Sequence, residues 1–81
     1  SSQHMRGEAM DIDLDGTMNG VTNAQLFNYI RFNLDFDQLI WEFGTDSNPD
    51  WVHVSYDVAG KNRRNIFKGF RSNGRVHYKP Y

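Results

Sequence analysis

The sequence predicts a small α+β domain in which one helix packs on a small, mainly antiparallel sheet. Apolar and polar residues alternate in several short segments, one segment repeats apolar residues at helical spacing, and turn-forming residues separate these segments. The chain has 81 residues, of which 38% are hydrophobic, and it has no cysteine. A disulfide scaffold and thiolate metal sites are therefore excluded. A membrane-spanning helix is also excluded, because no apolar run approaches roughly 18 residues.

The helix is predicted over residues 23–33. Thr22 and Gln25 have the spacing of a capping box, which marks the start of a helix. The apolar residues that follow are spaced by one, three and four positions, namely Leu26, Phe27, Ile30 and Leu34. This spacing produces one apolar stripe, which we expect to face the core.

Alternation with a period of two predicts the strands. In residues 8–14 one face would carry Met10, Ile12 and Leu14, and Asp11 would point to the other face. Residues 38–43 form a second predicted strand, with Leu39, Trp41 and Phe43 on one face.

A third strand is predicted over residues 51–56, where His53 lies opposite the apolar face formed by Val52 and Val54. Trp51 is expected to be a core residue. Residues 66–70 and 76–78 are weaker strand candidates on either side of Asn73-Gly74, a pair that favours a hairpin turn.

Three side chains from two distant segments form a candidate metal site. His4 lies in a predicted loop, Asp11 lies on the polar face of a strand, and Gly7 allows the chain to bend between them. If the strand over 51–56 lies near the strand over 8–14, His53 faces the same space as Asp11. Two imidazoles and one carboxylate, with a fourth position open for water, are typical of a catalytic zinc site.

A calcium loop is the alternative interpretation of the acidic part of this segment. Residues 11–16 have the Asp-x-Asp-x-Asp-Gly opening of an EF-hand loop. Counted from Asp11, however, the twelfth position is Thr22, where that loop requires a bidentate Glu. No helical pattern precedes the segment, so zinc is the favoured interpretation.

The pattern Ser-x-His-x-x-Gly-x-Ala-x-Asp is formed here by Ser2, His4, Gly7, Ala9 and Asp11. It resembles the motif of the zinc D-alanyl-D-alanine peptidases and the related phage endolysins, which share the hedgehog/DD-peptidase fold. In that family an acidic residue three positions before a later histidine is the general base, and Asp50 and His53 have that spacing. Residues 36–43 also look like the phage and prophage members, so the resemblance covers about residues 1–58.

The resemblance implies that His4, Asp11 and His53 are zinc ligands and that Asp50 is the general base. If Asp50 is only a turn residue, Glu42 is the next candidate for the base. The implied activity is hydrolysis of a peptide bond in peptidoglycan stem peptides, of the D-Ala-D-Ala carboxypeptidase or the L-Ala-D-Glu endolysin type. The rival hypothesis is a non-catalytic zinc-binding or cell-wall-binding module of the same fold.

The resemblance also sets expectations for domain organisation and location. We expect residues 1–81 to form a single peptidase domain without the family's upstream segment, which usually carries a substrate-binding arginine. Arg6 lies within the metal motif and is not that arginine, so this segment alone is expected to be incomplete as an enzyme. No signal peptide is visible. The expected site of action is the bacterial cell wall or periplasm, and a phage origin is consistent with the motif.

Charge divides the chain into two parts. Residues 61–81 contain seven Lys and Arg and no acidic residue, whereas residues 1–60 sum to −8, so the net charge is only −1. The preferred interpretation of this basic C-terminal segment is that it packs on the acidic part of its own domain. Contact with an anionic wall polymer ranks second, and nucleic-acid binding ranks below both.

Overall fold

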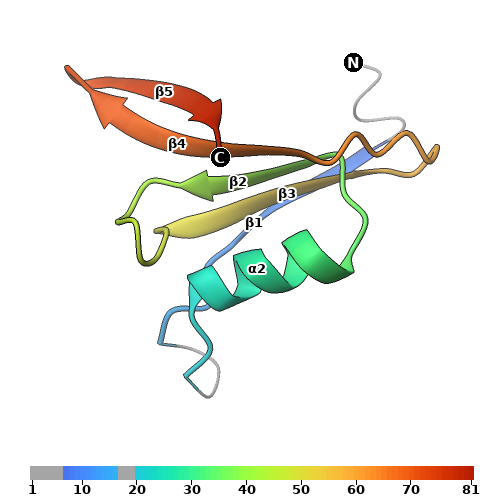
Figure 1. Cartoon of the computed structure of the whole chain (residues 1–81), viewed down its shortest axis with the longest axis horizontal. Coiled ribbons are helices and arrows are strands. Elements are labelled where there is room, and N and C mark those ends of the chain that lie inside the picture. The colour runs from blue at the N-terminus through green and yellow to red at the C-terminus, as the bar shows by residue number, and fades with distance from the viewer. Residues whose placement is uncertain (1–6, 17–19) are drawn as a thin grey trace.

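The computed structural model describes residues 7–16 and 20–81, which form a five-stranded sheet with one helix on one of its faces (Figure 1). In chain order the elements are β1 (Gly7–Ile12), α2 (Asn23–Asn33), β2 (Gln38–Glu42), β3 (Trp51–Asp57), β4 (Asn65–Ser72) and β5 (Arg75–Pro80). The predicted α+β class is confirmed. Each predicted helix or strand corresponds to an observed one, and the helix has the predicted bounds.

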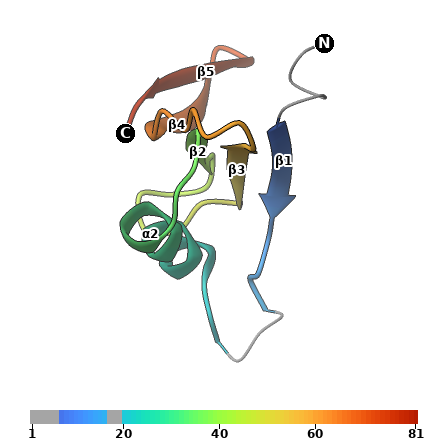
Figure 2. The ribbon, with the colours of Figure 1, turned by 90° about the vertical axis from the view of Figure 1, so that its right-hand side faces the viewer.

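The strand order across the sheet is β1-β3-β2-β4-β5. All neighbouring strands are antiparallel except β2 and β4, which run parallel. The sheet curls, and Figure 2 shows β5 above β4 on the side away from α2. The sheet therefore has one face covered by the helix and one open face, and β1 and β5 are its two edges.

The core lies between α2 and the covered face of the sheet. Phe27 and Ile30 of the helix pack with Leu39, Trp41 and Val52 of the sheet. The predicted capping box is present, since the Gln25 N–H donates to Thr22 Oγ1 at 3.1 Å and the Thr22 N–H donates to Gln25 Oε1 at 2.9 Å. Leu34 was predicted to face the core but is 46% exposed, because the helix ends at Asn33 and Leu34 is its C-cap.

Asn23, the first residue of α2, is completely buried and joins three segments of the chain. Its Nδ2 donates to Asp13 Oδ1 at 2.9 Å, to the Pro49 carbonyl at 3.2 Å and to the Asp50 carbonyl at 3.0 Å. Its Oδ1 accepts the Leu14 N–H at 2.6 Å. These bonds fix the segment after β1 and the start of β3 at the N-terminus of the helix. They also explain why β1 ends at Ile12, before the predicted boundary at residue 14.

The end of β2 departs from regular alternation. Phe43 has a φ of +58°, in the left-handed region, and Gly44 follows at +72°. A Cβ on Gly44 would lie 2.3 Å from the Asn48 carbonyl oxygen, so only glycine fits there. Phe43 consequently turns away from the core face on which it was predicted and stacks edge-on against Trp51, with ring centroids 5.4 Å apart.

Part of the basic C-terminal segment packs on its own domain, as the preferred interpretation predicts. Arg63 donates to both carboxylate oxygens of Asp37, at 2.7 and 2.8 Å. Arg64 donates to the carbonyls of Leu34 and Arg31, both at 2.7 Å, and so satisfies the free carbonyls at the C-terminal end of α2. No helix within residues 7–16 and 20–81 is both long and apolar enough to cross a membrane.

Candidate metal site on the open face

Asp11 and His53 meet on the open face of the sheet. They are direct register partners on the antiparallel strands β1 and β3, and Asp11 Oδ1 lies 2.9 Å from His53 Nδ1. Period-two alternation places both side chains opposite Val52, which belongs to the core on the other face. The sequence prediction that these two residues share one space is therefore confirmed.

The pair lies at a hollow of about 650 Å³. Neighbouring strands are about 4.8 Å apart, so the sheet edges β1 and β5 would be about 19 Å apart in a flat sheet. Because the sheet curls, residues from both edges line this one space, together with residues from the three strands between them. The lining residues are Asp11, Gln38, Ile40, Glu42, Phe43, Trp51, His53, Phe67, Val76 and Tyr78. Trp51, expected in the core, is thus part of the wall of the hollow.

Glu42 is a carboxyl group in this hollow that sequence reasoning ranked only second. It is just 6% exposed. Burial raises the pKa of Glu42, and the negative charge of Asp11 acts in the same direction, whereas the Tyr78 hydrogen bond and the His53 charge lower the pKa. Strand alternation was the available signal, because Gln38, Ile40 and Glu42 share a face of β2 opposite the buried Leu39 and Trp41.

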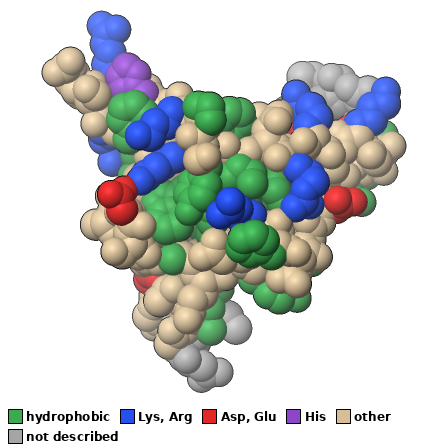
Figure 3. All heavy atoms as spheres, in the orientation of Figure 1, with side chains coloured by type: hydrophobic (Ala, Val, Ile, Leu, Met, Phe, Trp, Pro, Cys, Tyr) green, Lys and Arg blue, Asp and Glu red, His purple; other side chains and the backbone are tan. Residues whose placement is uncertain are grey.

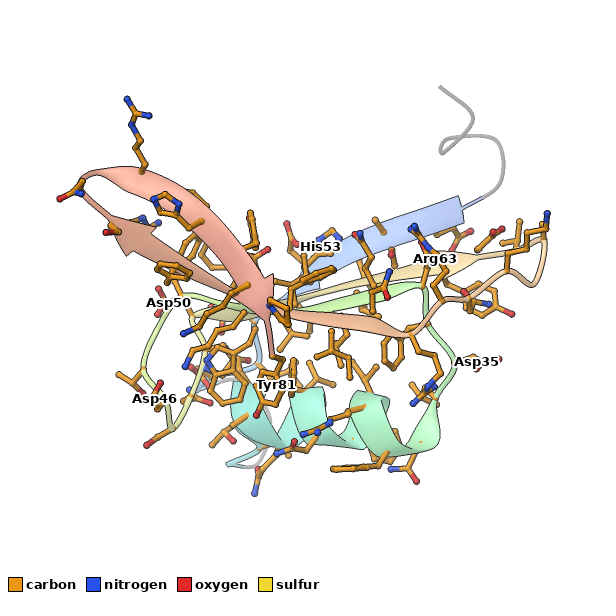
Figure 4. All side chains as sticks on the ribbon, turned by 45° about the horizontal axis from the view of Figure 1, so that its top comes forward. Asp35, Asp46, Asp50, His53, Arg63 and Tyr81 are labelled. Atoms are coloured by element: carbon orange, nitrogen blue, oxygen red, sulfur yellow. The ribbon has the colours of Figure 1, made fainter. Side chains whose placement is uncertain are left out.

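Asp50 lies apart from the Asp11–His53 pair. Its N–H donates to the Glu42 carbonyl at 2.9 Å, its carbonyl accepts from Asn23, and the residue is exposed. Asp50 lines a second hollow, of about 670 Å³, together with Lys68, Arg71 and Lys79. Figure 4 shows His53 above the sheet near β1, and Asp50 at the end of the sheet beside the loop that carries Asp46. The structure therefore brings together Asp11 and His53 but does not add Asp50 to their hollow.

The donor set present fits part of a zinc site. Imidazole nitrogen and carboxylate oxygen are both zinc ligands. Two donors of a tetrahedral zinc lie about 3.4 Å apart, so Asp11 Oδ1 and His53 Nδ1, at 2.9 Å, are close to the required separation. His4, the third expected ligand, lies outside the described residues. Within the described ranges, no group of three His, Cys, Asp or Glu side chains is arranged to hold a metal ion.

Lys and Arg side chains form a broken row among hydrophobic side chains on the face shown in Figure 3. Lys68 forms an ion pair with Asp46, whereas Arg71 and Lys79 lie over the rings of Phe43 and Phe70. For residues 7–16 and 20–81, no carboxylate forms an ion pair with Arg71, Arg75 or Lys79. The β4–β5 hairpin therefore presents cationic groups that have no ion-pair partner in the described part of the chain.

Comparison with known proteins gives no match: no family model, curated protein or solved structure is significantly similar to this chain.

Proposed function

We propose that this protein is a zinc peptidase of the hedgehog/DD-peptidase type that cleaves a peptide bond in peptidoglycan stem peptides. The observation that carries the proposal is the contact between Asp11 and His53. The motif resemblance names both as zinc ligands, and their side chains meet at 2.9 Å although 42 positions separate them in the chain. A chance contact would not account for the fact that the two residues of the motif are the ones that meet at the hollow.

In this proposal His4, Asp11 and His53 would hold the zinc ion. A zinc ion held there would act as a Lewis acid on the peptide carbonyl and would lower the pKa of water. Phe43 and Trp51 form an aromatic wall that limits solvent access to the peptide bond. Gln38, which also lines the hollow, offers amide hydrogen-bonding groups for the substrate backbone.

The base that accepts the proton from water has two candidates. Asp50 has the motif spacing, and its assignment stays a prediction. Glu42 has the better position, because it lines the same hollow as Asp11 and His53. In this proposal Glu42 is therefore the preferred base, and Asp50 stays the alternative.

Zinc content and activity test the proposal together. We expect about one zinc per chain by elemental analysis in the parent protein and in His77→Ala. His77 is a matched control, since it is exposed and stacks on Phe70 away from the hollow. We expect His53→Ala to lose the zinc. Purified murein should release stem-peptide fragments or D-alanine when treated with the full-length parent, and a chelator should stop the release until zinc is restored.

The outcomes separate the proposal from its rival. Equal zinc in His53→Ala and His77→Ala would contradict the metal assignment. Full zinc binding through His53 without any product from murein would favour the non-catalytic zinc-binding or cell-wall-binding module.

Anionic wall polymers are the proposed additional partner. The support is the set of cationic groups on the β4–β5 hairpin that have no carboxylate partner in the described part of the chain, namely Arg71, Arg75 and Lys79. Replacing these three residues with Gln should weaken co-sedimentation of the protein with teichoic-acid-containing walls. If the triple variant binds these walls at low salt as strongly as the parent does, this role is contradicted.

A further inference from the structure

Tyr78 reaches the hollow from the far edge of the sheet because residue 69 is glycine. Tyr78 on β5 is the register partner of Gly69 on β4. A Cβ at position 69 would lie 2.9 Å from Tyr78 Cε1 and 2.9 Å from Glu42 Oε1. Any larger residue would therefore push the tyrosine ring and the glutamate apart. Because Gly69 has no side chain, the Tyr78 ring can lie across β4 at this position and reach Glu42 on β2.

Tyr78 lines the hollow and holds Glu42 by a long hydrogen bond. Tyr78 donates to Glu42 Oε1 over 3.3 Å, longer than the usual 2.7–2.8 Å or so for two oxygens. Tyr78 is 53% exposed, whereas Glu42 is almost completely buried. The bond is therefore long, and Tyr78 is the more exposed residue of the pair.

The hydroxyl also keeps its proton. Burial of the hydroxyl raises the pKa of Tyr78, and the neighbouring Glu42 carboxylate raises it further. A neutral phenol with one proton is a hydrogen-bond donor that a carbonyl oxygen can accept. Around it, Ile40, Phe67 and Val76 provide an apolar surface on which small side chains can rest.

We propose that Tyr78 is a substrate-binding residue, whose hydroxyl turns from Glu42 to a backbone carbonyl oxygen of a stem peptide lying along the hollow. This inference rests on the proposed function for its choice of peptide. It assigns to the β4–β5 hairpin one wall of the substrate site, and it makes Gly69 a positioning residue. When the hydroxyl turns to the peptide, Glu42 loses its hydrogen-bond donor and becomes free to accept a proton.

Binding of the stem pentapeptide L-Ala-γ-D-Glu-L-Lys-D-Ala-D-Ala to the zinc-loaded protein tests this inference, with Kd measured by calorimetry. We expect Tyr78→Phe to raise Kd about 3- to 10-fold, the effect of one lost hydrogen bond. Gly69→Ala should raise Kd in the same direction, because its methyl group displaces the unaltered tyrosine. Tyr29→Phe is the matched control, since Tyr29 is similarly exposed, at 58%, but lies on α2. Its Kd should equal that of the parent.

Two results of the binding assay would overturn the inference: a parent that does not bind the pentapeptide, or a Tyr78→Phe variant with the Kd of Tyr29→Phe. Turnover separates this inference from the proposed function. If binding depends on Tyr78 but no hydrolysis occurs, the peptidase activity is contradicted and the peptide-binding site is supported. If Tyr78→Phe hydrolyses the peptide with an unchanged KM, the peptidase activity is supported and the role of Tyr78 is contradicted.

Discussion

Asp11 and His53 face each other across β1 and β3, and their contact depends on the register of these two strands. A slip of one residue would turn one of the two side chains to the face covered by α2. Asn23 secures this register, because it bonds both the segment that follows β1 and the segment that precedes β3. The candidate metal site is thus held by the buried start of the helix, on the other side of the sheet.

Replacing Asn23 should therefore damage both the fold and the site. Asn23→Ala would remove the hydrogen bonds to the Leu14 N–H and to the carbonyls of Pro49 and Asp50, and each lost bond of this kind costs roughly 1 kcal/mol or more. We expect the free energy of unfolding to fall by about 3 kcal/mol or more in urea titrations. Asn33→Ala is the control, because Asn33 is exposed at the end of α2. Equal losses in the two variants would contradict the joining role of Asn23.

Amide variants distinguish the two candidate bases. Glu42→Gln keeps the shape of the side chain but removes its basicity, so zinc should stay near one per chain while turnover falls by about two orders of magnitude or more. Asp50→Asn should retain most of the activity. The opposite pattern, with loss in Asp50→Asn only, would return the role of base to Asp50. Loss of zinc in Glu42→Gln would show that Glu42 is a ligand.

Removal of zinc should destabilise the protein. A metal that binds the folded chain and not the unfolded chain contributes its binding free energy to stability, about 2.7 kcal/mol when zinc is at a hundred times its Kd. For a domain of this size, 1 kcal/mol corresponds to roughly 4–8 °C in Tm. A chelator should therefore lower the Tm by about 10 °C or more in a calorimetric scan. An unchanged Tm would mean that zinc is absent or bound only incidentally.

The Asp37–Arg63 pair should make stability sensitive to acid. The hydrogen bonds from Arg63 lower the pKa of Asp37. A lowered pKa in the folded state gives stability that is complete above the unfolded value of about 4 and is lost as pH falls through the folded pKa. Asp37→Asn should lower the free energy of unfolding at pH 7, because an amide accepts only one of the two side-chain hydrogen bonds from Arg63 and has no charge to pair with it.

The measurement is unfolding by urea between pH 7 and pH 2. The loss of stability on acidification should be smaller in Asp37→Asn than in the parent. Asp35→Asn is the control, since Asp35 is exposed and lies 3.7 Å from Arg64. If Asp35→Asn and Asp37→Asn follow the same pH curve, the pair does not contribute to acid sensitivity.

Local patterns in the sequence were sufficient to predict the secondary structure and two members of the candidate site, Asp11 and His53. The capping box at Thr22 and the alternation around His53 depend on neighbouring residues only, so they are readable without the fold. The meeting of Asp11 and His53 followed from one assumption, that their two strands are adjacent.

The remaining features depend on the shape of the whole sheet. Tyr78 and Glu42 share the hollow with Asp11 only because the sheet curls and because β4 carries glycine at position 69. Phe43 left its predicted face because its backbone is left-handed, which a strand pattern does not reveal. Arg64 bonds the end of α2, whose position no local pattern specifies. Arg63 meets Asp37 because β4 starts beside the start of β2.

The parallel pairing of β2 with β4 has a consequence for the order in which the chain is completed on the ribosome. The segments through β3 emerge first and can assemble the strand order β1-β3-β2 around α2. One side of β2 then presents unpaired backbone groups until residues 65–72 emerge and β4 docks. During that interval Trp41 and Leu39 lie beside an open strand edge, so nascent chains have a window in which intermolecular pairing competes with folding.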